Sequence, residues 1–377
     1  MFSFLNVFCL LALSFLTDGS IESDQHQRET TDQNSSRELT EEAILPPKTI
    51  RSVTAFRDDF NSWNPNNYHV ACTAWGGGNN ELQVYTPGQS NLFTKNGHLY
   101  IKPTLTVNHP DFNEGKLYHG QMDLNGLWGY CTQGSNSGCN KHGGQDILPP
   151  VMSGYITTKA AIKYGRMNIR AKLPKADWTW PAIWTLPRNN TYGGWPQSGA
   201  MDIMESRGNA VAMGGGVNHG VNEVMSKLDW GPSGDTSQFY KTQVFKRKSS
   251  GDWHDDFHIY TLEWTADHLY TYVDNEIILR ADTPSNSYWS YGGFSGDNIW
   301  KHGGKDAPFD QYFQLVLNVA VGGNWFKNDY QYAYTRPWTD SSRHAKRDFW
   351  EHRNQWQNSW QGDNAAMIVD YVEMIQY

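Results

Sequence analysis

The chain has 377 residues, and its 17 Trp, 20 Tyr, 16 Phe and 35 Gly make it rich in aromatic residues and glycine. Lys and Arg number 31 against 39 Asp and Glu, a formal charge of −8, so the chain lacks the basic field that would attract a nucleic-acid partner. With 38% hydrophobic and 19% charged residues the composition is that of a globular protein, and a single all-β domain can account for most of the length.

Residues 1–16, MFSFLNVFCLLALSFL, form an apolar run that is followed by the small polar residues Asp18, Gly19 and Ser20. This order is typical of a secretory signal peptide, although the usual basic residues before the run are missing. A membrane anchor needs about 20 apolar residues, and this run is shorter. We therefore predict a signal peptide over residues 1–19, secretion to the extracellular space and no membrane-spanning segment.

Residues 20–48 are polar and contain no aromatic residue. They hold seven Asp and Glu against three Lys and Arg, a net charge of −4 that is half of the total. Such a segment cannot bury enough apolar surface to fold, so we predict a disordered acidic leader. It contains a sequon at Asn34 (Asn-Ser-Ser), and a second sequon lies at Asn189 (Asn-Asn-Thr). Each is a predicted glycosylation site in a secreted protein.

From about Phe56 onward the chain is aromatic-rich without an internal boundary or repeat, so residues 49–377 are predicted to form one domain. Its apolar runs are short, bounded by turn residues and mostly contain Val, Ile, Tyr or Thr, as strands do. These runs are Leu99–Ile101, Met167–Leu173, His258–Trp264, Leu269–Val273, Phe313–Val321 and Met367–Ile375. The segment Asp274-Asn275-Glu276 predicts a hairpin between Leu269–Val273 and Ile277–Leu279.

Only Ser341–Trp356 resembles a helix, with a Ser at its start and few β-branched residues, and a loop is the alternative for this segment. Many strands, Gly-rich connections and almost no helix predict an all-β fold, an antiparallel β-sandwich of the jelly-roll kind. Residues 105–155 and 324–366 are long and irregular, which in a compact domain usually marks loops that build a binding site.

Removal of a signal peptide would take Cys9 with it and leave three cysteines. Cys131 and Cys139 enclose seven residues rich in Gly, Ser and Asn, which favours a small disulfide-closed loop in an oxidising compartment. Two free thiols are the alternative. Cys72 would then be unpaired, and a buried free thiol is favoured over an intermolecular bridge.

No metal ligand set stands out in the sequence. There is no Cys-x-x-Cys pair, and the one His-x-x-x-His spacing, His254 and His258, leads into a strand-like run instead of lying on a helix. We therefore predict no zinc or other metal centre and no cofactor.

The segment WPQSGAMDIMESRGN, residues 195–209, carries two carboxylates, Asp202 and Glu205, in a strand-like pattern. Side chains alternate along a strand, so Ala200 and Asp202 share a face, whereas Glu205 would point away. A bulge between Ile203 and Glu205 adds one residue and brings all three onto one face.

These residues resemble glycoside hydrolase family 16, specifically its laminarinase-like branch, whose signature is Glu-x-Asp-x-x-Glu in a bulged strand. This chain has Ala-x-Asp-x-x-Glu. The resemblance covers about residues 50–377 through further motifs in family order: NNELQVYT at Asn79–Thr86, YGRMNIRAKLP at Tyr164–Pro174, WPAIWTLP at Trp180–Pro187, DFHIYTLEWT at Asp256–Thr265, FQLVLNVAVGG at Phe313–Gly323 and MIVDYVEMIQY at the end. It implies a curved jelly roll with substrate across its concave face.

In that family the first Glu is the nucleophile, the Asp assists it and the last Glu is the acid/base of a retaining glycosidase mechanism. Carried over, Asp202 matches the assisting carboxylate, Glu205 the acid/base and Ala200 the nucleophile position. A methyl group cannot attack an anomeric carbon, and losing one member of a catalytic unit commonly lowers turnover by about 10⁴- to 10⁶-fold. A second departure is Asp229 in LDWGP, where active relatives look more like Leu-His-Trp-Gly-Pro. Two changes at one site indicate a lineage released from catalysis.

The binding half of the site is predicted to be kept, because sugar rings lie on indole faces while their hydroxyls need polar partners. The resemblance implies sugar contact at Asn79, which Glu81 and Gln83 follow in strand alternation. The full set of predicted substrate-binding residues is Trp75, Asn79, Trp180, Trp184, Trp195 and His219. A place in the sandwich core is the alternative for any single Trp, and a structural role is the alternative for His219. We expect Arg207 to pair with Glu205 or Asp202, since buried carboxylates need a partner.

The resulting hypothesis is a secreted, non-hydrolytic β-1,3-glucan-binding protein that resembles the invertebrate glucan-recognition and Gram-negative-bacteria-binding proteins of innate immunity. The resemblance also implies lipopolysaccharide and immune-cascade proteins as partners, and a structural calcium ion, for which no clear ligand cluster is visible. Residues 20–48 are too few for the extra N-terminal glucan-binding module of those relatives. One competing hypothesis is an active endo-β-1,3-glucanase in which another carboxylate, such as Glu223, compensates for Ala200. Another is a structural jelly roll without sugar affinity.

Overall fold

The computed structural model describes residues 52–377, which form one compact unit. The predicted signal peptide over residues 1–19, the predicted leader over residues 20–48 and the sequon at Asn34 lie outside the described residues. No helix in residues 52–377 is long and apolar enough to cross a membrane.

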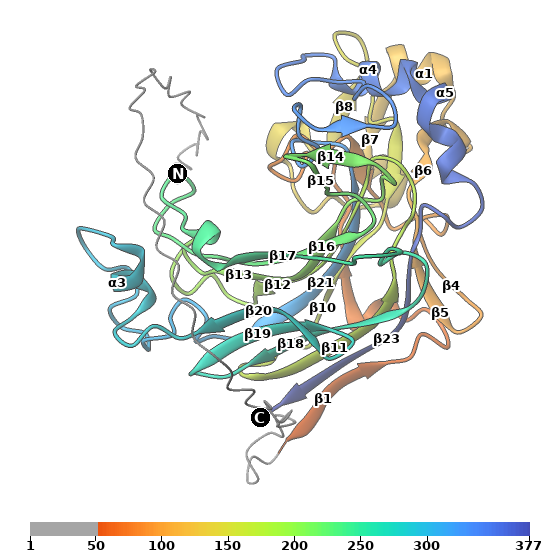
Figure 1. The fold of residues 1–377 in the computed structure, drawn as a ribbon. Helices are drawn as coiled ribbons and strands as arrows, with labels where there is room; N and C mark the ends of the chain where they lie inside the picture. The colour runs from red at the N-terminus through yellow and green to blue at the C-terminus, as the bar shows by residue number, and fades with distance from the viewer. Residues whose placement is uncertain (1–51) are drawn as a thin grey trace, which may run out of the picture. The chain divides into compact units, whose positions relative to one another are not determined.

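Two large antiparallel sheets stack on each other (Figure 1). The eight-stranded sheet has the order β20-β19-β18-β11-β23-β5-β4, with β1 paired to β23. Its strands are β1 (Val53–Asp58), β4 (Leu92–Lys95), β5 (His98–Ile101), β11 (Gly165–Lys172), β18 (His258–Trp264), β19 (His268–Val273), β20 (Glu276–Asp282) and β23 (Met367–Gln376). The seven-stranded sheet has the order β17-β16-β13-β12-β21-β10-β2. Its strands are β2 (Tyr68–Val70), β10 (Tyr155–Thr158), β12 (Thr179–Pro187), β13 (Ala200–Ser206), β16 (Glu223–Asp229), β17 (Gln243–Arg247) and β21 (Phe313–Val321).

Three small sheets and short helices complete the described part. The small sheets comprise β3 (Gln83–Tyr85), β6 (Thr104–Leu105) and β9 (Val151–Ser153); β7 (Gln121–Asp123) and β8 (Asn140–His142); and β14 (Ala212–Gly214), β15 (Val217–Asn218) and β22 (Gln331–Tyr332). The α-helices are α1 (Glu114–His119), α2 (Leu124–Trp128), α3 (Tyr288–Gly292), α4 (Ala345–Glu351) and α5 (Arg353–Trp356). The 3₁₀ helices are η1 (Pro65–Asn67), η2 (Thr106–Asn108), η3 (Ser135–Ser137), η4 (Phe239–Thr242) and η5 (Gln357–Trp360).

The predicted antiparallel sandwich is confirmed, and all six predicted strands lie in the two large sheets. The hairpin is also confirmed, with a turn formed by Asp274 and Asn275 alone. Both turn residues have positive φ, which a two-residue hairpin of this twist requires. Glu276, placed in the turn by the prediction, instead starts β20.

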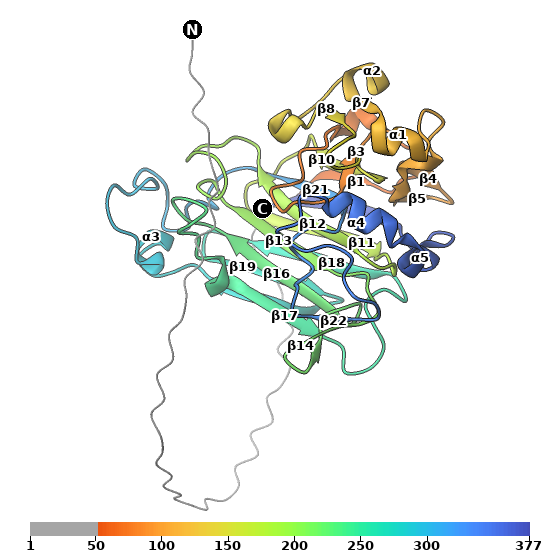
Figure 2. The same ribbon diagram turned by 90° about the horizontal axis from the view of Figure 1, so that it is seen from above.

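The segment Ser341–Trp356 is helical only from Ala345 onward, as α4 and α5. Residues 105–155, which we expected to be irregular, contain α1, α2 and several short strands. Helix α1 lies near α4 and α5 from the other end of the chain (Figure 2). Two hydrogen bonds of 3.1 Å join them, from the Trp350 indole and from Arg353, both to Glu114 Oε1. Segments that are remote in sequence thus pack against each other, and sequence patterns within either segment cannot predict this contact.

The space between the two large sheets is filled by alternate residues of each strand. In β11 the buried residues are Gly165, Met167, Ile169 and Ala171, and the intervening polar residues are half-exposed. From the other sheet β13 contributes Met201, Ile203 and Met204 to the same core. Each fully buried aliphatic side chain stabilises the fold by about 1.5–3 kcal/mol. The core thus holds one face of β13 in place, and the opposite face, which carries Ala200, Asp202 and Glu205, is not part of this core.

The disulfide between Cys131 and Cys139 is present, with Cα atoms 5.5 Å apart, and Cys72 is a buried free thiol. Both predictions are therefore confirmed. Burial raises the pKa of the Cys72 thiol to about 12, so this group is chemically inert near neutral pH.

His254 is buried at the end of β13, where its Nε2 lies 3.0 Å from Ser206 Oγ and its Nδ1 contacts the Pro174 carbonyl oxygen. Burial lowers its pKa to about 4, whereas an unfolded histidine titrates near 6.5. Between these values the unfolded state binds more protons, so stability falls as the pH falls from about 6.5 to about 4. Because of His254, we expect the free energy of unfolding to be about 2 kcal/mol lower at pH 5 than at pH 7.

Urea unfolding of the wild type and of His254→Gln at both pH values measures this loss. The variant should lack that part of the pH dependence even where its overall stability is lower. An unchanged pH dependence would contradict the assignment.

Candidate functional site

A bulge in β13 brings the three signature positions onto one face, hereafter the β13 face. Across the pairing with β16, Ala200, Asp202 and Glu205 stand opposite Asp229, Lys227 and Met225, with a register shift between Asp202 and Glu205. The pairing with β12 shifts at the same place, so that Trp184 stands opposite Asp202 and Ala182 opposite Glu205. In β16, Asp229, Lys227 and Met225 are two residues apart, so their side chains lie on one face of the sheet. Ala200, Asp202 and Glu205 pair with them and lie on the same face, which confirms the predicted bulge between Asp202 and Glu205.

Lys227 lies between two carboxylates of the β13 face. Its Nζ is 3.0 Å from Asp202 Oδ2 and 3.0 Å from Asp229 Oδ2. Both carboxylates are buried, and the Lys227 side chain is 20% exposed. The sequence analysis missed Lys227, because it lies 25 residues after Asp202 and nothing in the sequence shows that β13 and β16 pair.

The titration behaviour of this group follows from burial and mutual attraction. Burial raises the pKa of Asp202 well above its usual value, Lys227 opposes this shift, and the neighbouring Glu205 and Asp229 add to it. Burial disfavours the Lys227 ammonium, but attraction by Asp202, Asp229 and Glu205 outweighs this and raises its pKa well above the usual value. Lys227 therefore stays charged and holds the carboxylates together.

Ala200 is fully buried and faces Asp229 across the strand pair. Directly opposed side chains in an antiparallel pair have Cβ atoms about 4.5–5.5 Å apart. The position where the family resemblance expects a nucleophile thus holds a covered methyl group next to an ion-paired aspartate.

Glu205 is held from one side only. The Trp180 indole Nε1 donates a 2.9 Å hydrogen bond to Glu205 Oε1, while Oε2 is buried and has no hydrogen-bond partner within residues 52–377. Burial raises the pKa of Glu205, which favours the protonated carboxyl.

Trp180 is only 8% exposed and belongs to a buried cluster, as the core alternative expects, and its contact with sugar stays a prediction. Its ring is stacked on Trp325, with centroids 5.1 Å apart and 12° between the planes. The Arg207 guanidinium lies 4.0 Å from the centroid of Trp325. Trp325 was missed by the sequence analysis, although it lies only two residues after the glycine pair that ends the FQLVLNVAVGG motif.

Trp184 is half-buried and anchors a polar network. Its Nε1 donates to Asn318 Oδ1 at 2.8 Å, and Asn318 Nδ2 donates to the Tyr85 hydroxyl at 3.1 Å. The Tyr85 hydroxyl is 3.3 Å from Glu81 Oε2, which also accepts from Gln83 at 2.7 Å. This network holds the polar groups of β3, β12 and β21 in place beside the β13 face.

Of the other predicted sugar contacts, Trp75 is half-buried and Asn79 is exposed. Trp75 lines a pocket of about 340 Å³ together with Glu81, Gln83 and Trp338. Glu81 is close enough to Glu205 for their charges to interact, and the pKa of Glu81 is raised, mainly by burial. The pocket therefore adjoins the Glu205 end of the β13 face.

Exposed aromatic side chains lie at the Ala200 end. Trp195 is 57% exposed in the loop before β13, and its ring lies near Gly234 in the loop after β16. Phe239 and Tyr240 of η4 are also exposed, and Lys227 Nζ lies 5.7 Å from the centroid of the Phe239 ring. Neither of these two was found from the sequence.

The expected pairing of Arg207 with Glu205 or Asp202 is wrong. Arg207 Nη1 is 3.8 Å from Glu223 Oε1, and its other nitrogens donate to the Trp325 carbonyl. Glu223 also pairs with His219 at 3.0 Å and with Arg247.

His219 has both ring nitrogens engaged by protein atoms, at Glu223 and at the Gly214 carbonyl, 3.2 Å away. Its ring is stacked on Tyr330, with centroids 4.6 Å apart. These contacts correspond to the structural alternative for His219, and sugar contact by this residue has no direct support.

No group of three or more His, Cys, Asp or Glu residues able to hold a metal ion occurs in the described part of the chain. Asn189, the second predicted glycosylation site, is exposed in the loop after β12. Glycosylation there remains a prediction.

Comparisons with a family model and with curated proteins point to the same family, and solved structures share its fold. The family model Glycosyl hydrolases family 16 matches residues 141–292. A β-1,3-glucan-binding protein of Penaeus monodon is 41% identical over 348 residues, which cover 88% of this chain and 93% of that protein. A glucan endo-1,3-β-glucosidase of Cryptopygus antarcticus is 28% identical, with 76% and 92% covered. The chain spans only 56–66% of the length of the β-1,3-glucan-binding proteins of Hyphantria cunea, Manduca sexta, Tenebrio molitor and Galleria mellonella that it matches.

Among solved structures, the laminarinase of Rhodothermus marinus aligns with a TM-score of 0.54 at 24% identity, covering 86% of this chain and 97% of that one. At this level of identity the match shows the shared jelly-roll fold.

Proposed function

This chain belongs to glycoside hydrolase family 16, and on that premise we propose that it is a secreted protein that binds β-1,3-glucan without hydrolysing it. Glucan binding is supported by the Penaeus monodon relative, which is named for it. It is also supported by indole and polar groups along the β13 face and its two ends, at Trp75, Trp184 and Trp195.

The observation that carries the non-hydrolytic half of the proposal is the state of Ala200. No carboxylate stands at this position, its methyl group is fully buried, and the cross-strand neighbour Asp229 is ion-paired to Lys227. A retaining mechanism needs a free carboxylate about 5–5.5 Å from the acid/base. The two other signature carboxyls, Asp202 and Glu205, are kept as hydrogen-bonding groups in this proposal.

Glu223 is a poor substitute nucleophile. It is buried and paired with Arg207, Arg247 and His219. In the β16 register it also lies beyond Met225, the partner of Glu205, and therefore on the opposite side of Glu205 from Ala200. The alternative function, an endo-β-1,3-glucanase, retains one favourable observation, the raised pKa and unpartnered Oε2 of Glu205.

An innate-immune role, with lipopolysaccharide and immune-cascade proteins as further partners, is part of this proposal. It rests on the family resemblance, whereas secretion through a signal peptide over residues 1–19 rests on the apolar run at residues 1–16.

Incubating the purified chain with laminarin, and measuring both pull-down and release of reducing sugar, tests the proposal. Retention on insoluble glucan without sugar release is expected. Sustained turnover would establish the endo-glucanase instead, and absence of both would favour the structural jelly roll without sugar affinity.

Trp195→Ala is expected to weaken laminarin binding by about 5- to 30-fold with little change in melting temperature, because truncating an aromatic anchor at a binding surface commonly costs about 1–2 kcal/mol. Trp195 is the suitable residue because it is exposed, whereas truncating the buried Trp180 would cost about 3–5 kcal/mol of stability. Isothermal titration with laminari-oligosaccharides gives the affinities.

The matched control is Tyr272→Ala, which removes a half-buried aromatic side chain from the outward side of β19 in the other sheet. It should leave the affinity unchanged. Equal losses in both variants would mean that the β13 face and its rim do not hold the glucan.

A further inference from the structure

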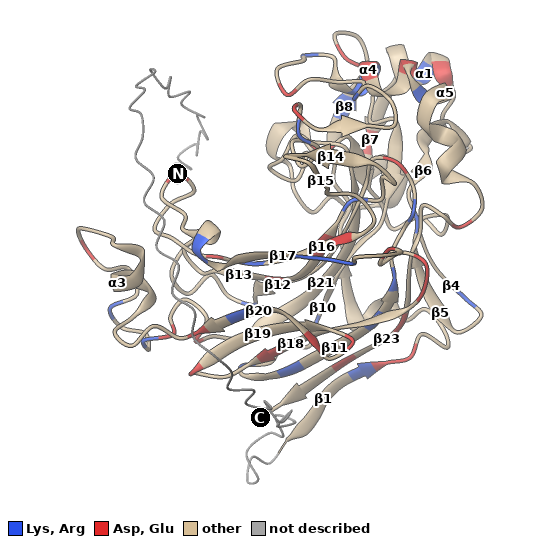
Figure 3. Ribbon diagram, viewed as in Figure 1, with Lys and Arg blue, Asp and Glu red and all other residues tan. Residues whose placement is uncertain are grey.

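A second pocket, of about 310 Å³, lies where the edges of the two large sheets meet, at β17 and β20. We call it the β17–β20 pocket. It is lined by Lys246, Arg247, Lys248, Trp253, His258 and Glu276, among others, and by no residue of the β13 face. Its volume is at the lower end of the range for small-molecule sites, roughly 300–1,000 Å³. The end of β17 carries the basic residues (Figure 3).

The positive charges of this pocket are not all balanced within it. Lys246 pairs with Glu276 at 2.8 Å, and Arg247 pairs with Glu223 outside the pocket. The Lys248 ammonium has no carboxylate partner within residues 52–377. It donates to the Asp252 carbonyl at 2.9 Å and lies 3.4 Å from His258 Nε2.

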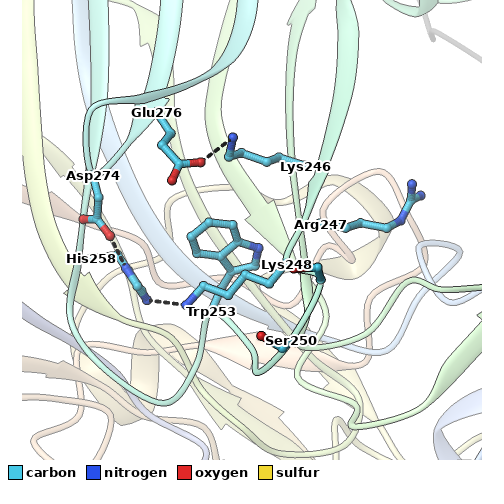
Figure 4. Close-up of a pocket in the computed structure, with 9 residues that line it drawn as sticks. Lys246, Arg247, Lys248, Ser250, Trp253, His258, Asp274 and Glu276 are labelled. Carbon is cyan, nitrogen blue, oxygen red and sulfur yellow. Dashed lines mark hydrogen bonds and ion pairs between the residues drawn. The ribbon is translucent and has the colours of Figure 1, made fainter.

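His258 explains the orientation of this lysine. Its Nδ1 bonds to the Asp274 carboxylate, which places the ring proton there and leaves Nε2 free to accept from Lys248 (Figure 4). An ammonium group has three N–H donors, and two of the three on Lys248 have acceptors. The third N–H and the uncompensated charge are available to a ligand.

Trp253 lines the pocket beside Lys248. Its ring lies across the middle of the pocket in Figure 4, with Lys248 Nζ 4.5 Å from the ring centroid. The side chain is almost entirely buried, so it forms a fixed wall of the pocket and leaves Lys248 as the charged group beside it.

We propose that the β17–β20 pocket binds a sulfate or phosphate ester carried on a sugar. The unused groups are donors: the third Lys248 N–H and the hydroxyl of the exposed Ser250. The acceptors Asp274 and Glu276 are already engaged by His258 and Lys246. A tetrahedral oxyanion takes several donors at once and balances the charge of Lys248. The volume leaves room for the sugar that carries it.

This site is independent of the proposed glucan site, so the two can fail separately. The test is calorimetric titration of the whole secreted protein with glucose 6-sulfate, glucose 6-phosphate and plain glucose at constant ionic strength. Saturable binding of one or both esters, and not of glucose, is expected. A preference between the esters identifies the natural substituent. No saturable binding of either ester would overturn the proposal.

Lys248→Met should raise the dissociation constant for the bound ester at least tenfold while laminarin binding is unchanged. Lys116→Met is the matched control, because Lys116 is also a lysine that donates to a backbone carbonyl, at Asp111, but lies on α1. It removes the same charge and should leave ester binding intact. Equal weakening in both variants would show a diffuse effect of net charge and would overturn the site. Lys248→Arg should retain binding within about threefold, which separates loss of the charge from loss of the fold.

Discussion

Replacing Ala200 by Glu and Asp229 by His in the same chain is expected to produce hydrolysis of laminarin at least about 100-fold above the wild type. A missing member of a catalytic unit commonly accounts for about 10⁴- to 10⁶-fold in turnover, so partial recovery is well within this range. The double change introduces, at both positions, the residue that the family resemblance implies for an active enzyme. Asp202, Glu205 and the Trp180 hydrogen bond to Glu205 are already present.

Ala200→Glu alone is expected to stay within about tenfold of the wild type. The new carboxylate would face Asp229 directly across the strand pair, where like charges are destabilising. It would also compete with Asp229 for Lys227 and add volume at a fully buried position, which commonly costs 1–3 kcal/mol. Removing the Asp229 charge relieves the first two of these conflicts.

Reducing-sugar release from laminarin, measured for the wild type, both single variants and the double variant, tests this order. Adding Glu205→Gln to the double variant should abolish the gained activity, which ties it to the β13 face. Full activity of the single Ala200→Glu variant would show that Asp229 is no obstacle. A folded but inactive double variant would contradict the view that the rest of the catalytic arrangement survives.

The sequence was sufficient for the sandwich and for the β13 face. The alternation of apolar and polar residues in a strand such as β11 is visible in the local sequence. The bulge could be inferred because Asp202 and Glu205 are three residues apart and share a face only if one residue is added between them. The Cys131 to Cys139 pairing is equally local. These short helices were missed, because α1 and α2 have only a few residues each and α1 is held by contacts with Trp350 and Arg353, more than 200 residues away.

The electrostatics of the site could not be predicted for the same reason. Lys227 reaches Asp202 only because β13 and β16 pair, and Trp325 reaches Trp180 only because the chain turns back after β21. Arg207 was assigned to the wrong carboxylate, since sequence proximity to Glu205 does not show that its side chain instead extends toward Trp325 and Glu223. Partner choice among buried charges depends on such tertiary contacts.

Lys227→Met is expected to lower the free energy of unfolding by about 3–5 kcal/mol at pH 8, because removing one partner of a buried ion pair leaves uncompensated charge. Asp202, Asp229 and Glu205 are all buried, and Lys227 is the cation nearest to the first two. Lys175→Met is the matched control. Lys175 also contacts two carboxylates, Asp252 at 2.7 Å and Asp255 at 2.9 Å, but it is 44% exposed. Exposed pairs contribute about 0–1 kcal/mol.

The loss caused by Lys227→Met should shrink as the pH falls toward 5.5. Burial already raises the pKa of Asp202 and Glu205 above their unfolded values, and removal of the ammonium raises both further. The folded variant then binds more protons than its unfolded chain, so its stability rises, relative to the wild type, as the pH falls through the raised pKa values. Urea unfolding of both proteins at pH 8 and pH 5.5 measures this difference, and the contribution of His254, common to both, cancels. Adding Asp229→Asn should recover part of the loss at pH 8. A deficit below about 1 kcal/mol at pH 8, or one independent of pH, would mean that Lys227 does not hold these carboxylates together.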